Sequence, residues 1–174
     1  PHKEFSEKNH ILLQQIYEGL VRFGPQGAIE PALAVSWEQI DPLKMRFHLR
    51  DKVRFHNGEV FDAEAVRFSI ERILDRRTQS PAFGFVNTVL RVDVIDPLTV
   101  DIVTHIPDGI LLNRLAWTVQ IIPPKYQREV GDDGFARLPV GTGPFQFVSW
   151  EKASRINLKA NPAYWMKGYP KLQE

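Results

Sequence analysis

The hydrophobic period changes between residues 45 and 74, and this change restricts the fold more than any other feature of the sequence. Alternate residues over 45–49 are apolar, which is typical of a half-buried strand. A second expected strand, over residues 53–56, leads into Asn57-Gly58, a pair that tolerates the positive φ of a tight turn. The first half of this stretch therefore predicts strands joined by a turn.

A capped helix is expected directly after this turn. Asp62 can accept a hydrogen bond from a free amide of the first helical turn, and the helix is predicted over residues 63–74. Phe61 before the cap and Val66 at the fourth helical position form a hydrophobic staple, which sets how the chain enters a helix. Strands and a helix so close together require a fold that contains both.

The same two periods recur along the rest of the chain. Ser6 is placed to cap a helix over residues 7–18, and Gly19 to end it. Further helices are expected over residues 109–116 and 125–130, and strands over residues 90–94, 100–102, 119–122, 145–150 and 156–159. Because no repeat or low-complexity linker separates these segments, they predict one mixed α and β unit.

The amino-acid composition argues against several classes of function. The 174 residues carry 22 basic and 21 acidic side chains, so the net charge of +1 gives no support for a nucleic-acid partner. There is no cysteine, which excludes disulfides, thiolate metal sites and a cysteine nucleophile. The longest apolar runs are much shorter than the roughly 20 residues of a membrane helix.

The glycine pair in "LPVGTGPFQFVSWE" raises the question of a phosphate loop. A Walker-type loop needs a Lys and a Ser or Thr directly after its last glycine, and neither follows Gly143. A dinucleotide fingerprint needs a third glycine and a helix, whereas the alternation after Pro144 predicts a strand. Gly141 and Gly143 are therefore expected to form a tight turn that feeds a strand.

The sequence gives little support for a catalytic site or a metal site. The histidines lack the spacing of a metal motif, and although His48 and His56 could face each other across a hairpin, no third ligand accompanies them. Neither a G-x-S-x-G elbow nor an H-E-x-x-H motif occurs. The pair Asp132-Asp133 has polar, Gly-rich neighbours and is interpreted as part of a solvated loop. We expect no metal, no cofactor and no enzymatic activity.

Aromatic and polar residues on irregular segments are typical of a ligand cleft. Two segments have this character, "PHKEFSEKN" before the first helix and "LAWTVQ", in which Trp117 and Thr118 stand between an expected helix and an expected strand. Trp117 has a second interpretation, since a tryptophan at such a place is often core packing. Periodicity alone favours the core.

Six segments of the chain resemble a known family. "QIYEGLVRF", "PALAVSWE", "MRFHLRDKVRFHNGEVFDAEAVRFSIERILD", "VDVIDPLTVDI", "PVGTGPFQFVSWE" and "LKANPAYWMKGYPKL" occur in the order found in the extracellular solute-binding proteins of family 5. These are dipeptide, oligopeptide and nickel receptors of ABC importers. The resemblance covers essentially the whole chain.

The resemblance implies an architecture. It implies that the chain matches the first part of a longer protein with a two-lobed, type II periplasmic-binding-protein fold, so that the first lobe is incomplete here. Residues 1–28 would start that lobe, residues 29–138 would form its smaller subdomain, and residues 139–174 would return to its sheet. The returning strands of the longer protein would complete the sheet, and without them the isolated chain is expected to expose an apolar edge and self-associate.

The resemblance also implies solute contacts. The segment Glu4, Phe5 and Ser6 matches one cleft-lining loop, Trp117-Thr118 matches a second, and Phe83 and Phe85 in "SPAFGF" match a third. For Trp117 the resemblance favours the ligand over the core. The ligand-binding residues expected for this chain are Glu4, Phe5, Ser6, Phe85, Trp117 and Thr118.

The implied function is capture of a small solute, with peptide as the default, for delivery to ABC permease subunits in the membrane. The implied location is periplasmic or extracellular, either free or held by a lipid anchor. The runner-up hypothesis is a solute-sensing domain of a transcription regulator, in which a helix-turn-helix would precede the chain. The sequence upstream of Pro1 distinguishes the two hypotheses.

Overall fold

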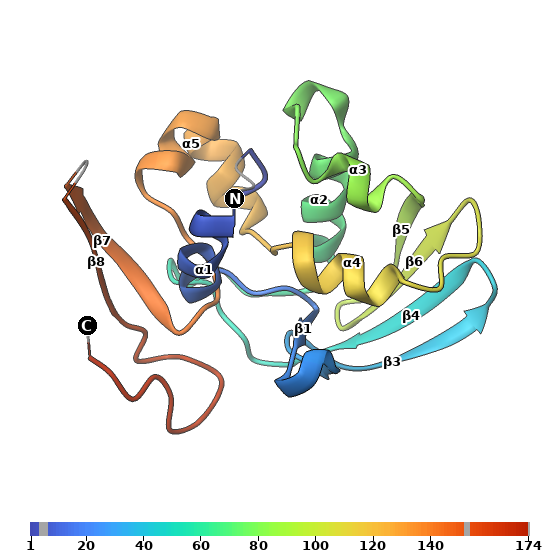
Figure 1. Cartoon of the computed structure of the whole chain (residues 1–174), viewed down its shortest axis with the longest axis horizontal. Helices are drawn as coiled ribbons and strands as arrows, with labels where there is room; N and C mark the ends of the chain where they lie inside the picture. The colour runs from blue at the N-terminus through green and yellow to red at the C-terminus, as the bar shows by residue number, and fades with distance from the viewer. Residues whose placement is uncertain (4–6, 152–153, 174) are drawn as a thin grey trace.

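The mixed α and β architecture predicted from the sequence is confirmed. A computed structural model describes residues 1–3, 7–151 and 154–173 (Figure 1). In chain order the elements are α1 (Glu7–Ile16), β1 (Val21–Phe23), the 3-10 helix η1 (Pro25–Gly27), β2 (Ile29–Pro31), β3 (Ala34–Asp41), β4 (Lys44–Leu49), α2 (Ala63–Leu74), the 3-10 helix η2 (Arg76–Thr78), α3 (Phe83–Val86), β5 (Val89–Asp96), β6 (Thr99–Thr104), α4 (Leu111–Thr118), α5 (Pro124–Arg137), β7 (Phe145–Glu151) and β8 (Arg155–Ala160). Figure 1 shows the β7–β8 hairpin at one end of the molecule, the larger sheet at the other, and α1, α2, α4 and α5 between them.

The larger sheet has four antiparallel strands in the order β3-β4-β6-β5. Phe47 at its centre lies opposite Trp37 of β3 and Val100 of β6. Phe47 and Val100 are fully buried, whereas Arg46 on the other face is partly exposed. The alternation predicted over residues 45–49 is therefore confirmed, and it directs one face of the sheet into the core.

Helix α2 packs against β5 and β6 on the buried side of this sheet. It begins and ends where the sequence predicts. At its start the Asp62 carboxylate accepts a hydrogen bond from the Ala65 N–H at 3.1 Å and satisfies an amide of the first turn. Val66, Ile70 and Ile73 are fully buried along one side of the helix. Each such side chain contributes about 1.5–3 kcal/mol through burial.

Two predicted strands are wrong. Residues 53–56 form only an isolated bridge between Arg54 and Val60, beside a short turn in which the Phe55 N–H donates to the Glu59 carbonyl at 2.9 Å. The next amide, the His56 N–H, donates to the Gly141 carbonyl at 2.8 Å. Residues 119–122 are buried but belong to no strand. The Ile121 N–H donates to the Glu18 carbonyl at 2.8 Å, and the Ile122 N–H donates to the Ser69 hydroxyl at 3.0 Å. Residues 119–122 thus have long-range bonds in place of a sheet ladder, whereas residues 53–56 combine a local turn with one long-range bond.

One helix is shifted from its predicted position and another is longer than predicted. Helix α4 continues to Thr118, so that Trp117 lies in its last turn rather than in a loop. Helix α5 continues through a break at Gly131, where φ is +67°, and ends at Arg137. Glycine accepts this φ without strain, so the helical axis can change direction there. Among the described residues, no helix is long and apolar enough to cross a membrane.

The buried apolar side chains form two clusters. The larger one lies between the four-stranded sheet and helices α2 and α4, and it includes Phe47 and Ile70. The smaller one lies where α1 and α5 meet, and consists of Ile16, Tyr17, Ile122 and Phe135, with Phe147 of β7 packed against it. The hairpin of β7 and β8 pairs with no other strand of the described chain. The elements at the two ends of the molecule thus have separate cores.

Candidate ligand-binding site

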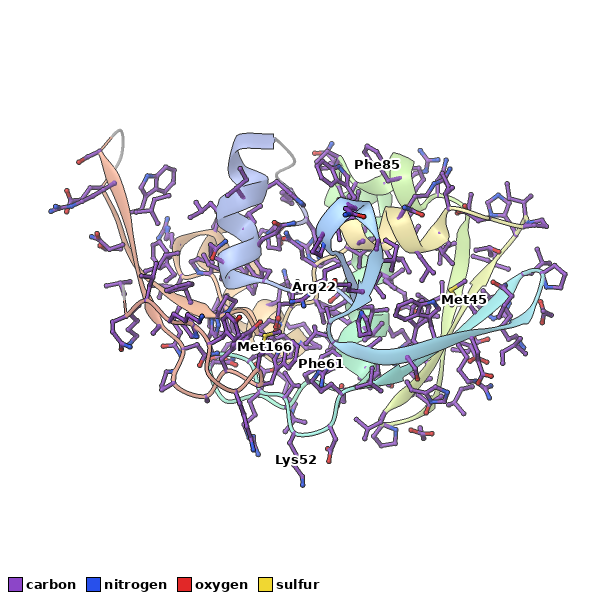
Figure 2. All side chains as sticks on the ribbon, turned by 60° about the horizontal axis from the view of Figure 1, so that its bottom comes forward. Arg22, Met45, Lys52, Phe61, Phe85 and Met166 are labelled. Atoms are coloured by element: carbon purple, nitrogen blue, oxygen red, sulfur yellow. The ribbon has the colours of Figure 1, made fainter. Side chains whose placement is uncertain are left out.

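The residues expected to contact a solute lie in three places. Glu4, Phe5 and Ser6 fall outside the described residues. Phe85 lies on α3 with about 41% of its surface exposed, and Figure 2 shows it at the outside of the molecule. Trp117 and Thr118 end α4, and α3 and α4 are in contact. The structure therefore brings the helices of Phe85 and Trp117 together, and their role in binding stays a prediction.

Trp117 belongs to an aromatic cluster built from three distant parts of the chain. Its ring centroid lies 4.5 Å from that of His10 in α1, with the two planes tilted by 34°. The ring of Phe23 in β1 meets Trp117 edge-on, with centroids 6.3 Å apart. About 37% of Trp117 remains exposed. The tryptophan is thus neither core nor a fully solvated side chain, and it presents a surface suited to stacking.

Thr118 differs from its neighbour in exposure. Its side chain is buried, and its hydroxyl donates a hydrogen bond to the Arg114 carbonyl at 2.8 Å, one turn earlier in α4. In this conformation the hydroxyl hydrogen of Thr118 is already bonded within the helix. Thr118 therefore exposes less surface to a solute than Trp117 does.

The turn at Gly141 and Gly143 packs against the C-terminal end of α1. A Cβ on Gly141 would lie 2.0 Å from the Ile16 carbonyl oxygen, and one on Gly143 would lie 2.6 Å from that of Gln15. The Gly143 N–H donates to the Ile16 carbonyl at 2.9 Å and satisfies one of the free carbonyls of the helix end. The predicted turn is confirmed, and its glycines are needed because two backbones approach each other closely.

His56 completes this turn. Its Nδ1 accepts from the Gly141 N–H at 3.3 Å, and its Nε2 donates to the Gly143 carbonyl at 2.9 Å. The bond that Nδ1 accepts requires a neutral ring, and burial lowers the pKa of His56 below its usual value. His48 instead lies 3.4 Å from the Glu38 carboxylate. The possibility that His48 and His56 face each other is therefore wrong.

Sequence reasoning missed Glu18 as the residue that joins four segments. Its carboxylate accepts hydrogen bonds from Thr142, Tyr164 and the Trp165 indole at 2.8–3.1 Å, and its carbonyl accepts from the Ile121 N–H. Burial raises the pKa of this carboxyl, while the three donors act in the opposite direction. A single carboxylate among apolar neighbours was the available signal. Its partners are too far away in the sequence to be inferred.

The interpretation of Asp132 as part of a solvated loop is wrong. Asp132 lies within α5, and it pairs with Lys3 at 2.6 Å and with Arg72 of α2. The Gln127 amide donates to the same carboxylate at 2.9 Å. The hydrogen bond from Lys3 and then that from Arg72 hold the pKa of Asp132 below its ordinary value. The residue has a structural role in joining α2 and α5.

A groove of about 440 Å³ lies between α1, α5 and the β7–β8 hairpin. Most of its lining is apolar and includes Leu13, Phe135 and Trp150. His2 and Arg72 lie at its polar side. Among the described residues, the buried atoms His2 Nδ1, Arg72 Nη1 and Gln120 Oε1 have no hydrogen-bond partner.

The comparison with solved structures defines the class of protein. The fold is that of type II periplasmic binding proteins, over about a third of their chains. The structure of MoaA from A. tumefacien R10 in complex with mannopinic acid is 36% identical, with a TM-score of 0.88, over 99% of this chain and 36% of that chain. The structure of AgaA from the same source in complex with agropinic acid is 30% identical, with a TM-score of 0.90, over 97% of this chain and 34% of that chain.

The chain belongs to the bacterial extracellular solute-binding proteins of family 5. The family model, described as "Bacterial extracellular solute-binding proteins, family 5 Middle", matches residues 28–174. The glutathione-binding protein GsiB of Escherichia coli (strain K12) is 28% identical over 94% of this chain and 32% of its own length. GsiB of Pectobacterium atrosepticum is 28% identical over 99% of this chain and 34% of its own length. The chain thus spans about a third of the curated relatives that it matches, and the predicted resemblance is confirmed.

Proposed function

We propose that this chain is part of the substrate-binding component of an ABC importer, which captures a small solute outside the cytoplasmic membrane and delivers it to permease subunits. Its membership of family 5 is the observation that carries this proposal. The relatives are binding proteins, which favours a binding role over an enzymatic one. The proposed location is periplasmic or extracellular, and fractionation of the source cells tests it.

The proposed solute is a peptide or a compound of similar size derived from an amino acid. Relatives are named or solved with glutathione, the peptide STSA and mannopinic acid. The natural full-length product should be titrated calorimetrically with glutathione, a dipeptide, a tetrapeptide, mannopinic acid and Ni(L-His). Dissociation constants in the micromolar range or below for at least one of them support the proposal. Absence of binding to all five, together with no ligand in mass spectrometry of the purified protein, would refute it.

We further propose Glu4, Phe5, Ser6, Phe85, Trp117 and Thr118 as the solute contacts of this chain. The half-exposed aromatic surface of Trp117 supports its place among them. Trp117→Ala should weaken binding by at least about 2- to 10-fold, since stacked aromatic surface contributes about 0.5–1.5 kcal/mol beyond area burial. Ile40→Ala, at an exposed apolar residue of β3, is the control and should leave affinity unchanged. Equal affinities for both variants contradict the assignment.

We also propose how the chain is divided within one lobe. Residues 1–28, 29–138 and 139–174 are proposed as the start, the smaller subdomain and the returning part of one lobe. The relatives are about three times as long as this chain, so further segments of the protein have the length to fill the apolar groove beside β7. The β7–β8 hairpin, which pairs with no other strand among the described residues, supports this.

The isolated chain tests the lobe proposal. Residues 1–174 by themselves should self-associate and bind solute weakly or not at all, because part of the contacts and the exclusion of water are missing. Sedimentation of the isolated chain, next to the full-length product at equal concentration, measures this. A clean monomer that binds solute with full affinity contradicts the proposed lobe organisation.

A further inference from the structure

We propose that His10 is a positioning residue for Trp117, and that the contact between the two rings sets the orientation of the surface on which the solute stacks. This inference rests on the proposed function, because it assigns a role to a residue beside the same site. It concerns a residue that neither the sequence patterns nor the expected contacts single out.

The rings of His10 and Phe23 hold Trp117 from two directions. The His10 ring lies against Trp117 at 4.5 Å with a tilt of 34°, whereas the Phe23 ring meets it edge-on at 6.3 Å and 65°. Figure 1 shows α1 and α4 on either side of the centre of the molecule, with β1 below and between them. The orientation of Trp117 thus depends on three elements that the tertiary fold brings together.

His10 is itself oriented within α1. The Gln14 side-chain amide, one turn further along, lies 2.8 Å from the His10 Nε2. When that amide donates, Nε2 accepts and the ring proton resides on Nδ1, which fixes the tautomer. Burial lowers the pKa of His10, so the ring that contacts Trp117 is neutral at neutral pH. A neutral and hydrogen-bonded imidazole is a rigid partner for an indole.

Loss of this partner has a defined cost for binding. Without the His10 ring, the Trp117 side chain gains rotational freedom that binding must remove again. Ordering one side chain at an interface weakens affinity by about 2- to 10-fold, equivalent to about 0.4–1.4 kcal/mol. On this proposal His10 acts on the solute by holding that ring, so the effect of its loss should pass through Trp117.

The experiment is a double-mutant cycle in the natural full-length product. His10→Ala, Trp117→Ala and the double variant are titrated with mannopinic acid and, separately, with glutathione. His10→Ala should weaken binding by about 2- to 10-fold, and it should add nothing in the Trp117→Ala background. His10→Phe should restore affinity to within about twofold, because it keeps a ring against Trp117. Unchanged affinity in His10→Ala, or additive effects of the two substitutions, overturns the proposal.

A second measurement needs no solute. Near-ultraviolet circular dichroism reports the fixed environment of an indole, and the difference between wild type and Trp117→Phe isolates that of Trp117. His10→Ala should reduce this difference strongly, while far-ultraviolet spectra confirm that the variant is folded; His10→Gln replaces it if it is not. An unchanged difference spectrum overturns the positioning role. Absence of binding to either solute in wild type counts against the proposed function, while this spectrum still decides the role of His10.

Discussion

Gly141→Ala should be among the most destabilising single-methyl additions in this protein. The new Cβ would lie 2.0 Å from the Ile16 carbonyl oxygen and 2.8 Å from a ring carbon of Tyr17, whereas real Cβ atoms essentially never approach another atom within 3.0 Å. The two backbones must therefore separate by about 1 Å, the difference between 3.0 and 2.0 Å. Backbone at this position cannot yield as a flexible side chain would.

This separation breaks hydrogen bonds as well as packing. The bond from the Gly143 N–H to the Ile16 carbonyl, now 2.9 Å, and that from the His56 N–H to the Gly141 carbonyl, now 2.8 Å, both span the displaced region. Leaving a buried group unpaired costs about 1–3 kcal/mol, and overpacking costs a similar amount. The expected loss is about 3–6 kcal/mol, a large share of the roughly 5–15 kcal/mol of a typical domain.

Urea unfolding of the natural full-length product, followed by far-ultraviolet circular dichroism, measures this loss. With a slope of about 2 kcal/mol/M, the midpoint should fall by about 1.5–3 M. Gly109→Ala is the matched control, since a Cβ there meets nothing within 4 Å, and its midpoint should stay within about 0.5 M of wild type. A Gly141→Ala midpoint as high as that of the control would refute the close approach of the turn to α1.

Three further predictions test separate parts of the structure. Asp62→Ala should lower stability by about 0.5–2 kcal/mol, because the cap bond to the Ala65 N–H is lost, and an unchanged melting temperature contradicts this. Glu18→Ala should cost about 2–4 kcal/mol in denaturant unfolding by leaving three donors unpaired, whereas Glu18→Gln should cost less, since an amide can still accept and donate; equal losses sink the reasoning. The folded pKa of His56 lies below its ordinary value of 6.5, so the unfolded chain takes up the proton first, and stability should fall as pH drops below about 6.5. His56→Gln should reduce that slope, and a slope identical to wild type speaks against it.

The functional residues show what local sequence patterns can and cannot predict. Trp117 and Phe85 could be proposed from the sequence because a resemblance supplied their place, while periodicity alone favoured the core for Trp117. The contact of Trp117 with His10 could not be proposed, since it joins α1 to α4 and has no signature in either segment. The same holds for Glu18, whose donors Tyr164 and Trp165 come from the last described segment.

The sequence by itself determined the elements whose cause is local. The cap and apolar period specify α2, and strict alternation specifies β4 and the hairpin of β5 and β6, because neighbouring side chains decide these conformations. Tertiary structure alone decided where the remaining backbone donors go. Residues 53–56 and 119–122 look like strands, but the amides of His56, Ile121 and Ile122 bond to Gly141, Glu18 and Ser69, which no local pattern reveals. Every buried N–H must find an acceptor, and the fold, not the segment, determines which acceptor lies within reach.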